Sequence, residues 1–535
     1  MEELKMEDFL SLHLGFNDAE NYRRRENKEL FNQIFVVSSI LDEIVASNTF
    51  FLMGEKGTGK TAYAVYITNN THRDTSSLLT FIRETEYQQF VALKERNHLF
   101  LSDYTNIWKV IIYLLISEKI SQDKNESSIF SFTKFRNLKN AIDHYYSRAF
   151  SPEIIQAMSF VDKTSISAKL LAQYAEVGGE TGIELTFSES RFQTNLLFIQ
   201  RKFEDALRAI KLNKNHILFI DGIDIRPSSI EYEDYLACVK GLANAVWSIN
   251  NDFFANIKDS QGRLKVVLLV RPDIFDSLGL QNQNNKIRDN SVLLNWQTTY
   301  DEYRGSMLFK LADKLLRSQQ SSSLPLGVAW DYYFPYVTKS TSRHRDFDAS
   351  FISFLRYSYY RPRDIVTMLR FLQENLNEER RDNQLLTEED FDSSRFRRKL
   401  ANYLLGEVKD QLSFYYSSED YETFLKFFQY LKGGMKFDYA DYLNAYKQIE
   451  EFLQRNNHPI PSFLETSDVF LQFLYELNVI SYIEDPIDFR HQPFISWCFR
   501  ERTTSNISPK IKQDVRYEIH YGLARALRIG KRLVR

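Results

Sequence analysis

The chain has 535 residues, enough for two to four domains with sizeable buried cores. Glycine (18) and proline (11) are scarce, which excludes collagenous, low-complexity and turn-rich all-β proteins. The 68 Lys and Arg and the 71 Asp and Glu leave a net charge of −3, which argues against a globally basic nucleic-acid coat.

The two cysteines, Cys238 and Cys498, cannot build a disulfide framework or a multi-thiolate zinc site. No stretch approaches about 18 consecutive apolar residues, and the acidic start MEELKMEDF is unlike a signal peptide. We therefore expect a soluble, cytoplasmic protein without membrane contact. Abundant Phe (42) and Tyr (31), together with 26% charged residues, predict a helix-rich chain.

The first 300 residues are expected to form a lead-in and an α/β core. Residues 1–45 carry apolar positions at helical spacing and predict an N-terminal helical lead-in. Apolar runs predict buried strands at 49–53, 78–82, 216–220 and 266–270. Helical patterns lie between them, beginning at residue 61 and covering 193–210 and 231–250. Alternating buried strands and helices predict a parallel sheet covered on both faces, within a core spanning 46–300.

A long stretch without glycine or proline follows residue 61, and it predicts a largely helical segment. Its expected buried stripe consists of Trp108, Ile111, Ile112, Leu115 and Ile116. The polar region at about 120–190 is interpreted as an insertion between the second and third core strands.

The second half of the chain predicts two helix-rich parts. Residues 301–404 are helical and charged, which is typical of a lid. Residues 405–535 contain a Gly433-Gly434 turn, a helix at 469–477 and two strands at 479–484 and 487–491. A helix followed by a small hairpin predicts a winged-helix-like domain, which ends in a basic tail.

The scarce glycines concentrate in one loop between the first strand and the following helix. The segment fits G-x-x-x-x-G-K-[ST], in which glycines turn backbone amides toward a β-phosphate. In this pattern Lys60 bridges β- and γ-phosphates, and Thr61 ligates Mg²⁺. The sequence therefore predicts binding of a nucleotide with Mg²⁺ by Gly54, Glu55, Lys56, Gly57, Thr58, Gly59, Lys60, Thr61 and Ala62. The nucleotide is taken as ATP, although no motif distinguishes ATP from GTP.

A carboxylate stands at the end of the strand in HILFIDGID. Asp221 lies where open α/β sheets bind their ligands, and it can hold Mg²⁺ through water. Asp224 is the nearest second carboxylate. It is interpreted either as the base that polarises the attacking water or as a loop or cap residue.

The pairing of GEKGTGKT with FIDGID resembles the STAND and ORC-like branch of the AAA+ P-loop ATPases. The resemblance implies an ATP-hydrolysing core, a helical lid, a winged helix and a nucleotide-dependent oligomer. It also implies a switch that acts on a protein effector, as in bacterial anti-phage defence or stress responses. AAA+ relatives complete the site with an arginine from a neighbouring subunit, and Arg304 is a candidate.

Three further residues match positions of that family. Arg271 resembles the sensor 1 residue that reaches the γ-phosphate, with a strand-end salt bridge as the alternative. Arg363, in Arg361-Pro362-Arg363-Asp364, resembles the sensor 2 region, and an ordinary helix N-terminus is the alternative. His520 resembles the winged-helix histidine that senses bound ADP, and the alternative is a structural histidine on a helix.

The tail from Arg500 to Arg535 holds ten basic residues against three acidic ones. Beside a winged helix, this charge is compatible with sequence-independent phosphate contacts. The alternative function is thus a DNA-binding ATPase that acts as a loader or remodeller. The tail itself is otherwise interpreted as a solvated terminal helix or as a protein contact.

Overall fold

The computed structural model describes residues 6–82, 101–122, 197, 200–201, 203–226, 230–258, 260–340, 346–380, 385–486 and 493–529. These residues divide into two compact units. The sheet unit comprises Ser38–Gly54 and Lys60–Leu293, and the helical unit comprises Met1–Val37, Glu55–Gly59 and Leu294–Arg535. The predicted lid and C-terminal region therefore belong to one unit, together with most of the lead-in and five residues of the glycine loop.

The sheet unit is built on five parallel strands in the order β2-β3-β4-β1-β5. The four predicted strands are present, each shifted by a few residues. The fifth was not predicted, because a three-residue run after a polar helix has no periodicity to detect. The strands are β1 (Phe51–Met53), β2 (Thr75–Phe81), β3 (Asn215–Asp221), β4 (Leu264–Val270) and β5 (Ser291–Leu293).

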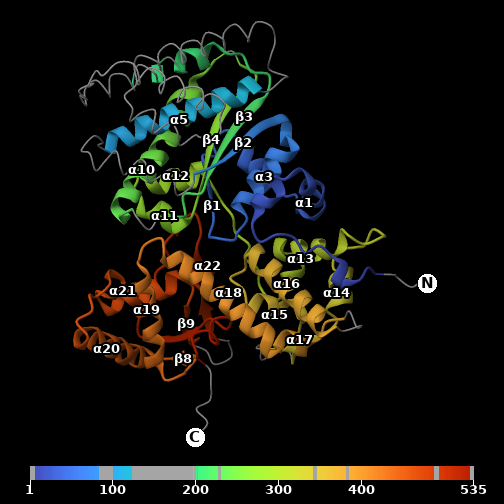
Figure 1. Ribbon diagram of the computed structural model, residues 1–535, viewed down its shortest axis with the longest axis vertical. Helices are drawn as coiled ribbons and strands as arrows, with labels where there is room; N and C mark the ends of the chain where they lie inside the picture. The colour runs from blue at the N-terminus through green and yellow to red at the C-terminus, as the bar shows by residue number, and fades with distance from the viewer. Residues whose placement is uncertain are drawn as a thin grey trace, which may run out of the picture. The chain divides into compact units, whose positions relative to one another are not determined.

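The strand order creates a switch point at β1. From β1 the chain runs through α3 (Lys60–Asn70) to the far edge strand β2. From β4 it passes through α11 (Pro272–Ser277) and α12 (Gln283–Asn290) to β5, on the other side of β1. Figure 1 draws α3 on one side of the strands and α11 and α12 on the other. Ligands of open α/β sheets bind at the carboxyl ends of strands beside such a point, which is where the glycine loop begins.

Two long helices cover the sheet near β3 and β4. They are α5 (Leu101–Gln122) and α10 (Tyr232–Ser248), and the stripe predicted for the first of them is buried throughout. Gly241 allows their close approach, because a Cβ there would lie 2.5 Å from the Cβ of Tyr104. Most of the predicted insertion lies outside the described residues. In the segment 193–210, the described residues 197, 200–201 and 203–209 are helical, as predicted.

The N-terminal lead-in is less regular than predicted. It consists of three 3₁₀ turns (Phe9–Ser11, Ala19–Arg23 and Arg25–Asn27) and the short helices α1 (Lys28–Ile34) and α2 (Ile40–Val45). Its turns belong to the helical unit, because lid side chains bind their backbone. Gln373, for example, donates to the carbonyls of Phe9 and Leu12 at 2.8 Å each. Apolar spacing therefore did not predict the lengths of these helices.

The predicted lid is largely helical, around a core that includes the fully buried Trp330. It also holds a two-stranded ribbon that was not predicted, β6 (Val337–Lys339) with β7 (Phe347–Ala349). Its helices are α13 (Met307–Arg317), α14 (Val328–Tyr333), α15 (Ser350–Arg356), α16 (Pro362–Glu379), α17 (Glu388–Asp392) and α18 (Ser394–Leu412).

The last part of the chain packs three helices with an antiparallel sheet of order β10-β9-β11-β8. The helices are α19 (Ser418–Phe427), α20 (Tyr439–Arg455) and α21 (Ser467–Glu476), and a short α22 (Cys498–Glu501) follows them. The strands are β8 (Lys436–Phe437), β9 (Ile480–Glu484), β10 (Phe494–Ser496) and β11 (Arg516–Ile519).

The predicted helix at 469–477 and strand at 479–484 are confirmed, whereas the strand expected at 487–491 lies outside the described residues. The helix assumed around His520 is wrong. Residues 516–519 form a strand because they pair with both β8 and β9, and turns follow up to residue 528. Among the described residues, no helix is long and apolar enough to cross a membrane.

Gly222, directly after β3, is expected to tolerate no side chain. Its φ is 91°, and a Cβ there would lie 2.5 Å from the Ile82 carbonyl oxygen. Gly222→Ala should therefore lower the free energy of unfolding by about 1–3 kcal/mol in urea titrations. Gly406→Ala is the control, because that glycine lies inside α18 with nothing within 4 Å of a new Cβ. It should leave stability unchanged or raise it by up to about 1 kcal/mol, and equal losses in both variants would refute this prediction.

Candidate functional site

The glycine loop between β1 and α3 owes its shape to two residues with positive φ. Gly57 and Gly59 have φ angles of 87° and 96°, a region that side chains rarely tolerate. Helix α3 starts at Lys60, so the loop leads into the N-terminus of an 11-residue helix. Such an N-terminus carries partial positive charge and unpaired amides, which attract anions.

Five successive carbonyls of this loop each accept a hydrogen bond. Two donors are local: the Lys60 ammonium binds the Gly54 carbonyl at 2.9 Å, and the Thr58 hydroxyl binds the Glu55 carbonyl at 2.8 Å. The other three come from the helical unit. They are Arg361 Nη1 to Lys56 at 2.9 Å, the Arg363 amide to Gly57 at 3.3 Å, and Trp296 Nε1 to Thr58 at 2.9 Å.

Held carbonyls determine where the loop amides point. In a trans peptide the N–H of the next residue points opposite to the carbonyl, and the described residues contain no cis bond. The amides that follow Lys56 and Thr58, those of Gly57 and Gly59, therefore face away from Arg361 and Trp296. The Thr58 amide between them donates to the Glu55 carbonyl at 3.2 Å. Loop amides that converge on one side form a concave anion-binding surface, called a nest.

Thr61 and Asp221 lie together at the carboxyl end of the sheet. The Thr61 hydroxyl donates to Asp221 Oδ2 at 2.6 Å, and the Gly222 amide donates to Oδ1 at 2.8 Å. Burial, with the charge of Asp224 as the next cause, raises the pKa of Asp221 to about 6. The Thr61 hydroxyl and the Lys60 ammonium act in the opposite direction. Burial and a second negative charge destabilise the ionised carboxylate, and a bound cation would stabilise it.

This pair of oxygens fits Mg²⁺, which prefers one or two protein ligands plus water and phosphate oxygens. In the described ranges, no cluster of three or more His, Cys, Asp or Glu side chains is suited to hold a metal without such help. Asp224 follows in the turn after β3 and is half-buried, close enough to influence Asp221. Its distance in sequence and its charge are compatible with either interpretation made above.

Arg271 directly follows β4, and its guanidinium pairs with a neighbouring carboxylate. Its Nε lies 3.0 Å from Asp273 Oδ1, and its Nη2 pairs with Oδ2 of the same residue. The residue is only 2% exposed. The structure therefore holds Arg271 in the strand-end salt bridge that was the alternative to the sensor 1 role.

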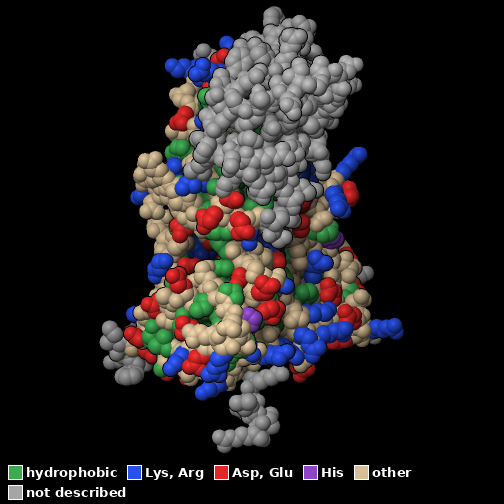
Figure 2. Space-filling model, turned by 60° about the vertical axis from the view of Figure 1, so that its left-hand side comes forward, with side chains coloured by type: hydrophobic (Ala, Val, Ile, Leu, Met, Phe, Trp, Pro, Cys, Tyr) green, Lys and Arg blue, Asp and Glu red, His purple; other side chains and the backbone are tan. Residues whose placement is uncertain are grey.

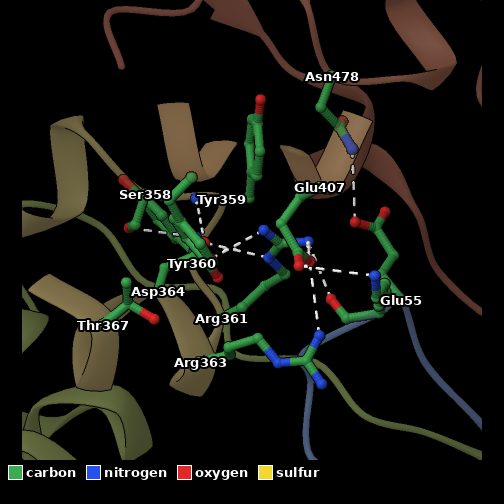
Figure 3. Close-up of polar contacts among 12 residues, drawn as sticks. Glu55, Ser358, Tyr359, Tyr360, Arg361, Arg363, Asp364, Thr367, Glu407 and Asn478 are labelled. Atoms are coloured by element: carbon green, nitrogen blue, oxygen red, sulfur yellow. Dashed lines mark hydrogen bonds and ion pairs between the residues drawn. The ribbon is translucent and has the colours of Figure 1, made fainter. Parts of the chain in front are cut away.

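Arg363 lies beside the loop, at the start of α16. A Cβ on Gly57 would approach the Arg363 Cβ to 3.1 Å, so the two backbones are nearly in contact. Its Nε donates to the Asn17 carbonyl at 3.2 Å, and its Nη1 lies 3.5 Å from Glu407. Figure 3 shows Arg361 and Arg363 around Glu407, next to the loop. Arg363 therefore lies next to the loop, and its contact with phosphate stays a prediction.

The side chains of Glu55 and Lys56 form ion pairs with the helical unit. Glu55 pairs with Arg502 and lies 3.4 Å from the Asn478 amide nitrogen (Figure 3). Lys56 pairs with Asp410 and lies 3.6 Å from Glu407. The charged side chains of these two loop residues thus bind other parts of the helical unit.

His520 is 2% exposed and directly follows β11. Its Nε2 lies 3.2 Å from the Ser358 carbonyl, and its Nδ1 accepts from the Gly522 amide at 3.2 Å. The second bond requires an unprotonated Nδ1, so Nε2 carries the proton. Burial lowers the pKa of His520 to about 4, and the ring packs against Tyr359 and Trp497. These contacts support a structural histidine, and nucleotide sensing stays a prediction.

Two other predicted contacts have protein partners. Arg304 pairs with Asp331 at 2.7 Å, which raises the pKa of the guanidinium. In the basic tail, three side chains pair with carboxylates and one stacks on an aromatic ring. The pairs are Arg502–Glu55, Lys512–Glu484 and Arg516–Asp485, and Arg500 lies over Tyr360.

Sequence reasoning missed several residues that hold the loop. Arg361 and Asp364 are three apart, and this spacing in the first turn of a helix was a usable signal for an ion pair. Trp296, Glu407 and Arg502 carry no local signal, because their partners lie far away in the chain. No protein-family model matches the chain, and no curated protein matches it either.

His520 should make stability depend on pH. Its pKa is lower in the folded protein, about 4, than the ordinary 6.5, so only the unfolded chain takes up a proton between these values. Folding stability is therefore present above pH 6.5 and is lost as pH falls toward 4, by as much as about 3 kcal/mol. His520→Gln should flatten this slope in urea unfolding measured at pH 7.5, 6 and 5. The exposed His458→Gln is the control, and parallel slopes in the wild type and His520→Gln would contradict the prediction.

Proposed function

We propose that the chain binds a magnesium nucleoside triphosphate, ATP by resemblance, at segment 54–61 and Asp221, and hydrolyses it. The observation that carries the proposal is the 2.6 Å hydrogen bond between Thr61 and Asp221, which are 160 positions apart. A hydroxyl at a helix start and a carboxylate at a strand end are the two protein groups that such enzymes use around Mg²⁺. The hydrogen bonds that hold the Lys56 and Thr58 carbonyls support the same proposal.

The proposed site assigns a task to each residue. The loop amides and the α3 N-terminus would bind the β-phosphate, and Lys60 would turn from the Gly54 carbonyl to phosphate oxygens. When bound, Mg²⁺ supplies positive charge that neutralises the phosphates. Asp224 is proposed to orient the attacking water and accept its proton. Arg271 and Arg363 would have to leave their present carboxylate partners to reach a γ-phosphate.

We further propose an AAA+-like switch that oligomerises with nucleotide and acts on a protein effector in bacterial defence. Its support is the order of parts: a sheet with the loop after β1, Asp221 ending β3 and Arg271 following β4, then a helical lid. In the last part, the chain runs through α19, β8, α20, α21, β9 and then β11. We take this order of helices and strands as that of a winged-helix domain.

The contacts favour this switch over the DNA-binding alternative. Helix α21, which directly precedes β9 and would be the recognition helix of a winged-helix domain, carries Asp468 and Glu476 but no lysine or arginine. Such helices normally bring cations to phosphates. Gln472 of α21 is also bonded to the backbone of Pro509 and Ile511, so part of its surface is covered. On the face drawn in Figure 2, acidic side chains lie among the basic ones.

Nucleotide titrations of variants test the proposed site. Lys60→Ala should weaken MgATP binding about tenfold or more in calorimetry, because a charged hydrogen bond to phosphate is lost. Lys426→Ala, which removes a charge from α19, is the control and should bind as the wild type does. Equal affinity in Lys60→Ala and the wild type, or no binding to the wild type, would refute the proposal.

Steady-state hydrolysis separates the two carboxylates. Asp221→Asn should abolish Mg²⁺-dependent turnover, because the proposed metal ligand loses its charge. Asp224→Asn should keep nucleotide affinity and lower kcat by about 10²–10⁴, the usual contribution of a general base. Retained turnover in Asp224→Asn would remove this residue from the mechanism.

A further inference from the structure

Arg361 is a buried arginine, and all three nitrogens of its guanidinium donate hydrogen bonds. It is 6% exposed, and its Nε and Nη2 donate to the two oxygens of Asp364 at 3.1 and 2.8 Å. The remaining Nη1 donates to the Lys56 carbonyl of the glycine loop at 2.9 Å. The guanidinium also lies over the ring of Tyr359, 4.8 Å from its centroid.

Asp364 serves to orient this arginine. It is fully buried, and besides Arg361 it accepts from the Tyr359 amide at 2.8 Å and the Tyr403 hydroxyl at 2.9 Å. A buried ion pair is tolerated only when its geometry is good and its other lone pairs are satisfied, as they are here. The bidentate fork fixes the orientation of the guanidinium, and its Nη1 then lies against the Lys56 carbonyl and 3.5 Å from Glu407 Oε2.

This contact acts on the peptide that joins Lys56 to Gly57. With the Lys56 carbonyl bound to Arg361, the Gly57 amide of the same peptide must point to the opposite side of the loop. Trp296 does the same for the next peptide but one, because its Nε1 binds the Thr58 carbonyl and so directs the Gly59 amide. A free glycine loop would sample many orientations of both peptides.

We propose that Arg361, aimed by Asp364, is a positioning residue that preorganises the loop amides for phosphate, with Trp296 as a second support. This inference rests on the proposed nucleotide site and adds a residue that acts through the loop rather than on the phosphate. It also separates the two arginines of Arg361-Pro362-Arg363-Asp364. Arg361 holds the loop from behind, and Arg363 contributes its backbone amide and packs on Gly57.

Arg361→Lys tests this role and keeps the charge. A lysine has one ammonium instead of a planar fork, so it cannot pair with both Asp364 oxygens and still reach the Lys56 carbonyl. We expect the affinity for MgADP and for magnesium pyrophosphate to fall by the same factor, about tenfold or more, in calorimetry. Pyrophosphate is included because it contacts only the phosphate nest, whereas ADP also has a base and a ribose.

The matched control is Arg356→Lys. Arg356 likewise pairs with a buried aspartate, Asp348, and donates Nη1 to a backbone carbonyl, that of Lys339 at 2.8 Å. Its partners belong to the lid ribbon, so Arg356→Lys should change the melting temperature without changing either affinity. Equal affinities in Arg361→Lys and the wild type, a loss for MgADP alone, or equal losses in both arginine variants would overturn the inference.

A second variant tests the positioning of the loop amides if Arg361→Lys fails to fold. Trp296→Phe keeps a buried ring and removes only the donor to the Thr58 carbonyl, so both affinities should fall about threefold. No change in Trp296→Phe overturns the inference under that condition. A wild type that binds neither ligand overturns the proposed function itself. A wild type that binds both and loses them in Lys60→Ala, but not in Arg361→Lys, overturns only the positioning role.

Discussion

The candidate site depends on one constraint: the backbone carbonyls of a glycine loop need donors if its amides are to converge on one side. Two donors are local, since Lys60 and Thr58 bind carbonyls within the loop. The others come from Arg361, the Arg363 amide and Trp296, hundreds of residues away. Glycine makes the shape accessible, and these donors make it the populated one.

This constraint explains why residues 55–59 belong to the helical unit, although β1 and α3 on either side belong to the sheet unit. The start of α16 supplies two of the remote donors, and α18 supplies Glu407 and Asp410 for the ammonium of Lys56. Glu55 is held in turn by Arg502. The two charged residues of the loop thus anchor it to distant parts of the helical unit.

Carboxylates of the protein bind the three arginines that were predicted to contact phosphate. Arg271, Arg304 and Arg363 were each predicted to meet a phosphate, and each lies by an acidic side chain of the protein, Asp273, Asp331 and Glu407. An arginine has a long side chain that pairs readily with either a carboxylate or a phosphate. A nucleotide would therefore have to compete with these partners, which links its binding to rearrangement of the arginines.

The sequence alone determined the parallel sheet, the loop and the position of Asp221 at a strand end. Buried strands and glycine loops are specified by residues that are adjacent in the chain. Their patterns can therefore be recognised from a short stretch of sequence. Only the tertiary structure decided the strand β11 before His520, the destination of each arginine and the donors to the loop carbonyls. Those features depend on partners such as Trp296 and Arg361, which no local pattern connects to Thr58 or Lys56. A hydrogen bond between distant residues is a property of packing, and packing is settled only when the whole chain has folded.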